Sequence, residues 1–218
     1  MRLALAALLL LALPTAAAAQ ELDQVVNAVE STYGKMADLQ AEFTQVARNK
    51  SLGQDVKAEG TVYLKKGGKM RWDYKNPSPQ QIVSDGTNLW VYTPELNQVN
   101  KGDAPKALAG PAGSFLQGLG KVREEFSVRF LNPSNKTDTS GRPVLDLTPK
   151  KPTPLLTRLV LTVDPKDSYL VRQAVLYDQL QNTVTMSFNR VAVNPGLSDT
   201  LFVFTPPKGA AVVPLDIR

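Results

Sequence analysis

The hydrophobic pattern of the chain begins with one helical stripe. Five apolar residues at positions i, i+3, i+4, i+7 and i+11 share it: Leu22, Val25, Val26, Val29 and Tyr33. A helix of 3.6 residues per turn brings such positions to one face. Gly34 follows directly, and glycine is a typical helix stop signal. The spacing therefore predicts an amphipathic helix that ends near Gly34.

From Leu39 onward, apolar positions alternate with polar ones, which is the period of a half-buried strand. The alternating pairs and triplets include Ala41/Phe43, Val62/Leu64 and Met70/Trp72/Tyr74. Gly67-Gly68 and Asp85-Gly86 separate runs of this kind. Such turns need positive φ at their centres, so they predict sequential antiparallel strands.

The second half of the chain continues this pattern of strands separated by turns. Strand-like runs occur at 144–147, 159–163, 170–177, 183–190 and 202–204, with turn residues at 164–167 and 181–182. The total is about ten or eleven strands. Twist accumulates in a sheet of that size, so we expect a barrel or a strongly coiled half-barrel. One long interruption, 102–120, carries Phe115, Leu116 and Leu119 at helical spacing.

The first residues have the layout of a secretory signal. Met1-Arg2 gives a positive start, Leu3 to Leu13 an apolar core, and Ala17 and Ala19 suit a signal peptidase. The apolar run is about half of the roughly 20 residues that span a bilayer. We therefore expect a cleaved signal peptide over 1–19, followed by a single domain over 20–218. No cysteine is present for lipid attachment.

The composition excludes the catalytic and metal-binding sites that depend on histidine or cysteine. The chain has no His and no Cys, which excludes Ser-His-Asp and Cys-His catalysis, His/Cys zinc sites and disulfides. The sequence Gly118-Leu119-Gly120-Lys121 lacks the spacing of a phosphate-binding loop, and Glu124-Glu125 would point to opposite faces of a strand. We expect no enzyme, no metal and no cofactor, although carboxylates brought together from distant segments would escape detection.

The net charge of +5 includes a basic cluster at Lys65, Lys66, Lys69 and Arg71. Aromatic residues nearby give it a superficial likeness to a nucleic-acid surface. An exported protein meets little nucleic acid, so lysines that solubilise an exposed hairpin are the simpler interpretation. Contact with an acidic partner or an anionic membrane is the alternative.

Four segments together carry a family resemblance. They are KMRWDYKNP from Lys69, QQIVSDGTNLWVYTPELNQV from Gln80, AEFTQ from Ala41 and FVFTPPKG from Phe202. In this order and spacing, the chain resembles the periplasmic outer-membrane lipoprotein carrier family, LolA. The resemblance implies a mainly β fold, an unclosed and roughly eleven-stranded antiparallel half-barrel whose concave face is covered by a helical lid. It also implies a monomeric periplasmic carrier.

The implied partners follow from the same resemblance. The cargo would be the acyl chains of lipoproteins, taken from an inner-membrane ABC complex like LolCDE and passed to an outer-membrane acceptor like LolB. Two other functions stay open, a lipoprotein-sensing regulatory domain of the same fold and an acceptor of the LolB type. The acceptor type needs an N-terminal cysteine, which this chain lacks.

Strand alternation then suggests which side chains line the cavity. The concave set would be Val62, Leu64, Met70, Trp72, Trp90 and Tyr92, with the lid contributing Phe115, Leu116 and Leu119. An offset of one residue would turn Leu89 and Val91 inward instead, and ordinary core packing explains each position as well as ligand contact does. Relatives carry an Arg-Pro pair that latches the lid. Lys66-Gly67 stands there in this chain, so Lys66 or Arg71 would act as the latch.

Overall fold

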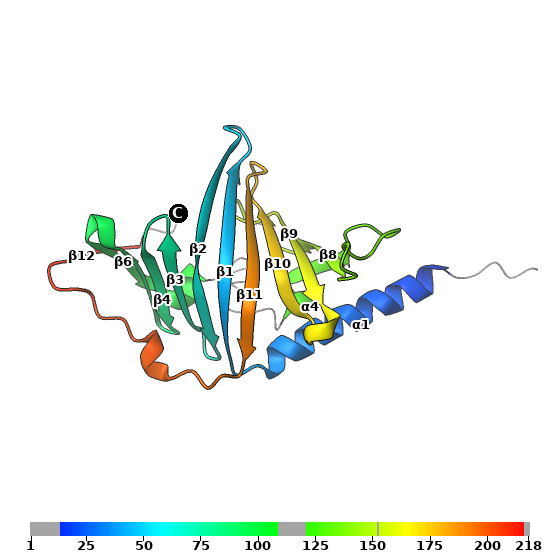
Figure 1. The fold of residues 1–218 in the computed structure, drawn as a ribbon, viewed down its shortest axis with the longest axis horizontal. Coiled ribbons are helices and arrows are strands. Elements are labelled where there is room, and N and C mark those ends of the chain that lie inside the picture. The colour runs from blue at the N-terminus through cyan, green and yellow to red at the C-terminus, as the bar shows by residue number, and fades with distance from the viewer. Residues whose placement is uncertain (1–13, 109–120, 152, 216–218) are drawn as a thin grey trace, which may run out of the picture.

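A single strongly curved sheet dominates the computed structural model, which describes residues 14–108, 121–151 and 153–215. Within these residues the sheet has twelve strands in the order β12-β6-β5-β4-β3-β2-β1-β11-β10-β9-β8-β7 (Figure 1). The first six are β1 (Asp38–Asn49), β2 (Gln54–Lys65), β3 (Lys69–Asn76), β4 (Gln80–Asp85), β5 (Asn88–Thr93) and β6 (Gln98–Asp103). The others are β7 (Phe126–Phe130), β8 (Val144–Pro149), β9 (Arg158–Asp164), β10 (Leu170–Tyr177), β11 (Thr183–Val193) and β12 (Ala211–Pro214).

Helices are few and mostly short. The long one is α1 (Pro14–Lys35), and the short ones are α2 (Ala104–Ala107), α4 (Val122–Glu125), η1 (Pro94–Leu96), η2 (Pro165–Asp167) and η3 (Asp199–Phe202). The apolar stripe of α1 packs Val25, Val26 and Val29 into the main core. The helix ends one residue after Gly34, so the predicted end near Gly34 is confirmed.

The longest ladders of the sheet are those that β1 forms with β2 on one side and with β11 on the other. Gly60 on β2 shows how closely the neighbouring strands approach each other. A Cβ built on it would lie 2.1 Å from the Asp73 carbonyl oxygen and 2.9 Å from the Phe43 ring. The β2–β3 register also shifts between Glu59 and Gly60. A strand can bend sharply at a bulge with glycine, which lets the sheet coil into a half-barrel.

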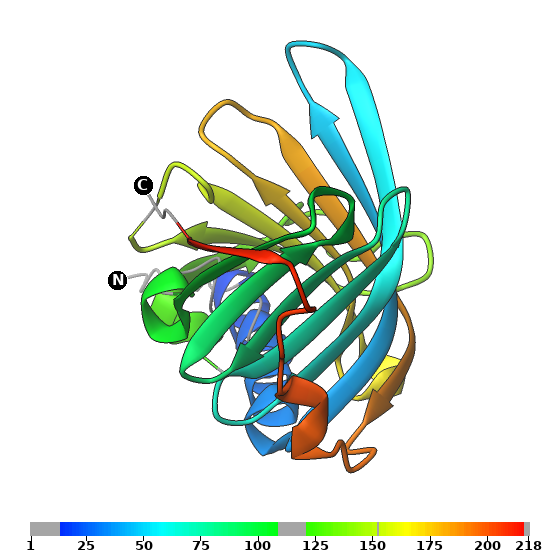
Figure 2. The ribbon, with the colours of Figure 1, turned by 90° about the vertical axis from the view of Figure 1, so that its left-hand side faces the viewer.

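Alternate residues of the strands build one continuous apolar core on the concave face. From the strands, its buried members include Leu39, Ala41, Phe43, Val62, Met70, Trp72, Leu89, Leu145, Leu147, Leu159, Leu161, Ala174 and Met186. The helix α1 lies over this face and adds its own valines to the same cluster. In Figure 2 the helix is seen behind β3 to β6, within the curve of the sheet.

The convex face of β3 to β6 is covered by the C-terminal segment. Figure 2 shows this segment, orange to red, running in front of the strands on the side opposite α1. It begins with η3, where Phe202 is buried, and ends in β12, which pairs in parallel with β6. Val83 and Val99 are also buried outside the main core cluster, so a small second core lies beneath the segment.

The predicted antiparallel sheet is confirmed, with two differences in detail. Residues 202–204 were expected to form a strand, but Phe202 ends η3 and the next residues run without strand pairing. No strand-like run was identified where β6 and β7 lie, and a further strand, β12, lies in the tail after Ala210. Propensity alone favoured a strand at the Phe-Val-Phe run, whereas packing of its aromatic rings onto the sheet face decides the actual path.

An apolar interior beneath the first helix

Three of the expected cavity residues lie deep in the concave core. Val62 is 1% exposed, Met70 1% and Trp72 3%, while Leu64 is partly buried against the same cluster. Val62 pairs directly with Trp72, and Leu64 with Met70, so the four side chains share one face of β2 and β3. Their contact with acyl chains stays a prediction.

Aromatic rings give this interior its bulk. Phe43 packs edge-on against Trp72 at 5.1 Å and against Tyr74 at 4.9 Å between ring centroids. Phe188 reaches Trp72 from β11 at 6.5 Å. The indole Nε1 of Trp72 is buried and has no hydrogen-bond partner within the described part of the chain. The interior formed by the described residues is therefore apolar, and among them the Trp72 indole is the one buried side-chain donor without a partner.

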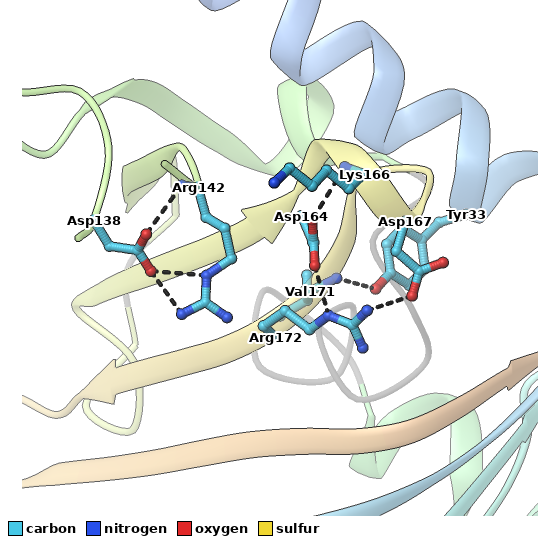
Figure 3. A network of polar contacts seen from close by, with 8 residues as sticks. All are labelled: Tyr33, Asp138, Arg142, Asp164, Lys166, Asp167, Val171 and Arg172. Carbon is cyan, nitrogen blue, oxygen red and sulfur yellow. Dashed lines mark hydrogen bonds and ion pairs between the residues drawn. The ribbon is translucent and has the colours of Figure 1, made fainter. Parts of the chain in front are cut away.

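Two hydrogen bonds fasten the end of α1 to the sheet. The Val171 N–H donates to the Tyr33 hydroxyl at 3.0 Å, and the Thr32 hydroxyl donates to the Ser168 carbonyl at 2.6 Å. Figure 3 shows Tyr33 meeting β10 beside the Arg172 ion pairs with Asp164 and Asp167. The β9–β10 register shifts between Val171 and Gln173, so an irregularity in the ladder coincides with the N–H that meets Tyr33.

Desolvation raises the pKa of Tyr33 to about 12, although the ring as a whole is only partly buried. The hydrogen bond from Val171 and the charge of Arg172 act in the opposite direction and are smaller influences on the pKa. The Tyr33 hydroxyl is therefore protonated throughout the physiological range.

Arg123, at the start of α4, holds the polar side of α1. Its guanidinium donates to Asn27 at 2.7 Å, to Asp23 at 2.9 Å and to Glu30 at 3.0 Å. The backbone N–H of Arg123 also donates to Glu30 at 2.7 Å. We call Arg123 and these contacts the clamp. Asp23, Asn27 and Glu30 are spaced i, i+4, i+7, so they share one polar face of α1, and this spacing is the sequence signal that points to the clamp.

The junction between α1 and β1 is anchored as well. Asp38 is buried and accepts hydrogen bonds from the N–H groups of Gly196 and Leu197, at 3.1 and 3.0 Å. Asn194 accepts from the Ala37 N–H at 2.7 Å. Because the junction is fixed on β1, any movement of α1 away from the sheet must pivot near this point.

Trp90 and Tyr92 were expected on the concave face, and that assignment is wrong. Both rings pack against Phe204 of the C-terminal segment, each at 6.0 Å between centroids. Leu89, by contrast, belongs to the concave core cluster. The alternative register is therefore the actual one, because neighbouring residues of a strand point to opposite faces.

Arg71 was expected as a latch for the lid, and its contacts contradict this. Its guanidinium binds Asp73 at 2.8 Å and donates to the Leu201 carbonyl at 3.3 Å, on the covered convex face. Lys65 and Lys69 bind Asp199 at 2.7 and 2.8 Å on the same side. These hydrogen bonds lower the pKa of Asp199 to about 2. Most of the basic cluster thus fastens the C-terminal segment.

Lys66 has an exposed side chain, and its backbone N–H donates to the Ala37 carbonyl at 2.9 Å. Its role as a latch stays a prediction. Phe115, Leu116 and Leu119, the expected lid residues, lie outside the described residues.

A groove of about 490 Å³ lies on the convex face of β8 to β11, away from this interior. Arg142 and Arg172 line it, and both are already paired with carboxylates, Asp138 and Asp164 among them (Figure 3). In the described parts of the chain, no group of three or more His, Cys, Asp or Glu could hold a metal ion. No helix of residues 14–108, 121–151 or 153–215 has the length and apolar character needed to cross a membrane.

Comparison with known proteins places this geometry in a family. The outer-membrane lipoprotein carrier protein of Dechloromonas aromatica (strain RCB) is 29% identical over 201 residues, covering 92% of this chain and 91% of the relative. The protein of the same name from Legionella pneumophila (strain Lens) is 31% identical over 196 residues, covering 89% of each.

A crystal structure of an uncharacterized conserved protein from Thermus thermophilus has a similar fold. Its TM-score is 0.56 at 14% identity, with 90% of this chain and all of the other covered. Residues 34–205 match the sequence profile described as "Outer membrane lipoprotein carrier protein LolA". The chain therefore belongs to the LolA family of outer membrane lipoprotein carriers.

Proposed function

We propose that this protein carries lipoproteins across the bacterial envelope by enclosing their acyl chains between the concave sheet face and α1. The observation that carries the proposal is the continuous apolar interior under a helix held by a small set of polar contacts. Such an interior needs no catalytic group, which agrees with a chain that has no His and no Cys. The names of the relatives support the same role.

The energetics explain why a carrier is needed. Burial of acyl chain is worth about 0.8 kcal/mol per methylene, so roughly fourteen methylenes gain on the order of 11 kcal/mol relative to water. Relative to a bilayer the gain is close to zero, since the chains already lie in hydrocarbon. Loading therefore needs an external source of energy, for which an inner-membrane ABC complex like LolCDE is the proposed partner, in the periplasm.

Unloading requires that the closed state be only slightly preferred. Among the described residues, Arg123 is 37% exposed, and Glu21, which binds Lys136 at 2.5 Å, is 51% exposed, so the ion pairs that hold α1 are screened by water. A ligand shifts the open and closed populations only by its different affinity for the two. Acyl chains that compete with α1 for the concave face would open it, and an acceptor like LolB would receive them at the outer membrane.

A reversible cross-link tests whether α1 must move. The chain contains no cysteine, so the pair Asn27→Cys and Arg123→Cys can be joined by a short bis-thiosulfonate cross-linker, whose disulfide bonds to the two cysteines a reductant cleaves. We expect the cross-linked protein to release no radiolabelled lipoprotein from spheroplasts, and the reduced protein to regain release.

The matched control joins Arg48→Cys to Asp55→Cys, which pair across β1 and β2 without involving α1. Cross-linking there should leave release unchanged. Normal release by the protein with α1 cross-linked to α4 contradicts the proposal.

A further inference from the structure

Three exposed leucines mark one end of the half-barrel. Leu52 is 67% exposed, Leu155 73% and Leu180 67%, each in a loop between two strands. The loops join β1 to β2, β8 to β9 and β10 to β11. We call the three residues the leucine rim. Isolated exposed leucines are ordinary, but three on adjacent loops need an explanation.

Hydrogen bonds from backbone N–H groups connect these loops. The Lys50 N–H donates to Asn182 Oδ1 at 3.0 Å, and the Gln179 N–H donates to the Pro154 carbonyl at 3.0 Å. The loop of Leu180 is thus bonded to the loops of Leu52 and Leu155. Figure 1 shows the β1–β2 and β10–β11 hairpins projecting side by side from the same end of the sheet. The three loops are therefore connected by hydrogen bonds at one end of the sheet.

The charge of this end is strongly asymmetric. Segments 48–57, 149–157 and 177–183 contain five basic residues, Arg48, Lys50, Lys57, Lys150 and Lys151, and two acidic ones, Asp55 and Asp178. Asp55 is bound by Arg48 at 2.7 Å, and Asp178 accepts the N–H groups of Leu180 and Asn182 at 2.8 and 2.9 Å. Lys50 and Lys151 are exposed and, among the residues described, have no ion-pair partner. Positive side chains therefore outnumber negative ones in the three loops that carry the leucines.

We infer that the leucine rim docks on the surface of an anionic phospholipid bilayer. Leucine side chains on separate loop tips suit shallow insertion among head groups, while neighbouring lysines meet the negative surface. A protein partner would need a broader complementary area than three single tips provide. The rim lies at the opposite end of β1 from Asp38 and the α1 junction. This inference does not depend on which cargo the concave face binds.

Vesicle flotation tests the rim directly. Purified protein should float with phosphatidylglycerol vesicles at low salt, at least tenfold better than with phosphatidylcholine vesicles, and the binding should weaken as salt rises. The variant carrying Leu52→Asp, Leu155→Asp and Leu180→Asp should bind at least tenfold more weakly. Lys50→Glu or Lys151→Glu should each reduce binding by about fivefold.

Val203→Asp is the matched control, because Val203 is 64% exposed on the C-terminal segment, away from the rim. It should bind vesicles like the unaltered protein. A second measurement uses an environment-sensitive dye on Leu180→Cys, which should shift to the blue with phosphatidylglycerol vesicles, whereas the dye on Val203→Cys should not.

The inference is overturned if the unaltered protein fails to float with phosphatidylglycerol, or if the triple variant floats equally well. It is also overturned if the triple variant instead abolishes a concentration-dependent dimer, since the rim would then bind a second copy of the chain.

Discussion

At the scale of single residues, two ionisable groups stand out because their surroundings hold them in one protonation state. Tyr33 keeps its proton through desolvation and accepts the Val171 N–H. Asp199 loses its proton readily because Lys65 and Lys69 bind it. Tyr33 fastens α1 to the concave face of the sheet, and Asp199 fastens the C-terminal segment to the convex face. The titration of each group therefore affects the attachment of a different element.

Replacing Tyr33→Phe should lower the free energy of unfolding by about 1 to 2 kcal/mol, because the Val171 N–H loses its partner. The pKa of Tyr33 rises from 10.0 to about 12 on folding, so the folded state holds the proton more tightly. Stability should fall for the unaltered protein between pH 10 and pH 12, and less steeply for the variant.

Chemical denaturation at a series of pH values measures both effects. Tyr63→Phe is the control, since Tyr63 lies on β2 and its hydroxyl makes no hydrogen bond within the described residues. Equal slopes for all three proteins above pH 10 would contradict the assignment.

The pKa of Asp199 falls from 3.8 to about 2 on folding, so its ion pairs stabilise the protein above pH 3.8 and are lost as the pH drops toward 2. Asp199→Asn should therefore be less stable than the unaltered protein at neutral pH, and the difference should shrink in acid. Because the pairs are solvent-exposed, added salt should also shrink it. Denaturation midpoints of the two proteins at pH 7 and pH 2.5 test this prediction. The same difference in midpoint at both pH values would contradict it.

At the scale of elements, α1 is a cover attached by side chains rather than by sheet pairing. Its valines supply apolar contact with the core, and its polar edge is held by Arg123. Elements attached in this way open at lower free energy than the strands beneath them. The strands instead depend on close backbone approach, most plainly at Gly60.

Arg123→Ala should loosen α1 without unfolding the sheet. We expect amide hydrogen exchange in residues 22–34 to become about three- to tenfold faster, in keeping with the loss of about 1 kcal/mol from partly exposed ion pairs. Exchange in β1 and β11 should be unchanged. Arg48→Ala removes a comparable ion pair to Asp55 on the β1–β2 hairpin and should leave α1 as it was. Faster exchange across the whole sheet would show that the clamp is not local.

Gly60→Ala should destabilise the protein by about 3 kcal/mol, because the new Cβ meets the Asp73 carbonyl oxygen at 2.1 Å. Gly34→Ala is the matched comparison, since nothing lies within 4 Å of a Cβ there. Alanine should stabilise that helical position by about 0.5 to 1 kcal/mol. Thermal unfolding of the two variants gives the comparison, and similar changes in both would refute the steric explanation.

At the scale of the whole molecule, the sequence pattern was sufficient for the architecture but not for the faces of every strand. Alternation on β2 and β3 identified Val62, Met70 and Trp72, which are buried together. On β5 every residue from Leu89 to Tyr92 is apolar, so period two could not distinguish the faces, and the inward residue turned out to be Leu89.

The contacts that attach α1 and the C-terminal segment to the sheet could not be predicted from the sequence, for a different reason. Arg123 and Asp199 act through partners roughly a hundred residues away, and a single sequence does not show which distant charges meet. The C-terminal segment also competes with strand propensity. Its Phe202 is buried and its Phe204 packs against Trp90 without strand pairing, which only the three-dimensional arrangement reveals.

The strand order also determines how the molecule can be assembled. β1, the first strand made, pairs with β11, nearly the last, and this seam joins two otherwise sequential wings. Pairings between chain positions so far apart form slowly. Pulse-labelled hydrogen exchange during refolding should therefore find the β2–β3 hairpin protected before the seam. Until β11 pairs with β1, the apolar face of the first wing is exposed to water, and the folding chain is most vulnerable to aggregation in that interval.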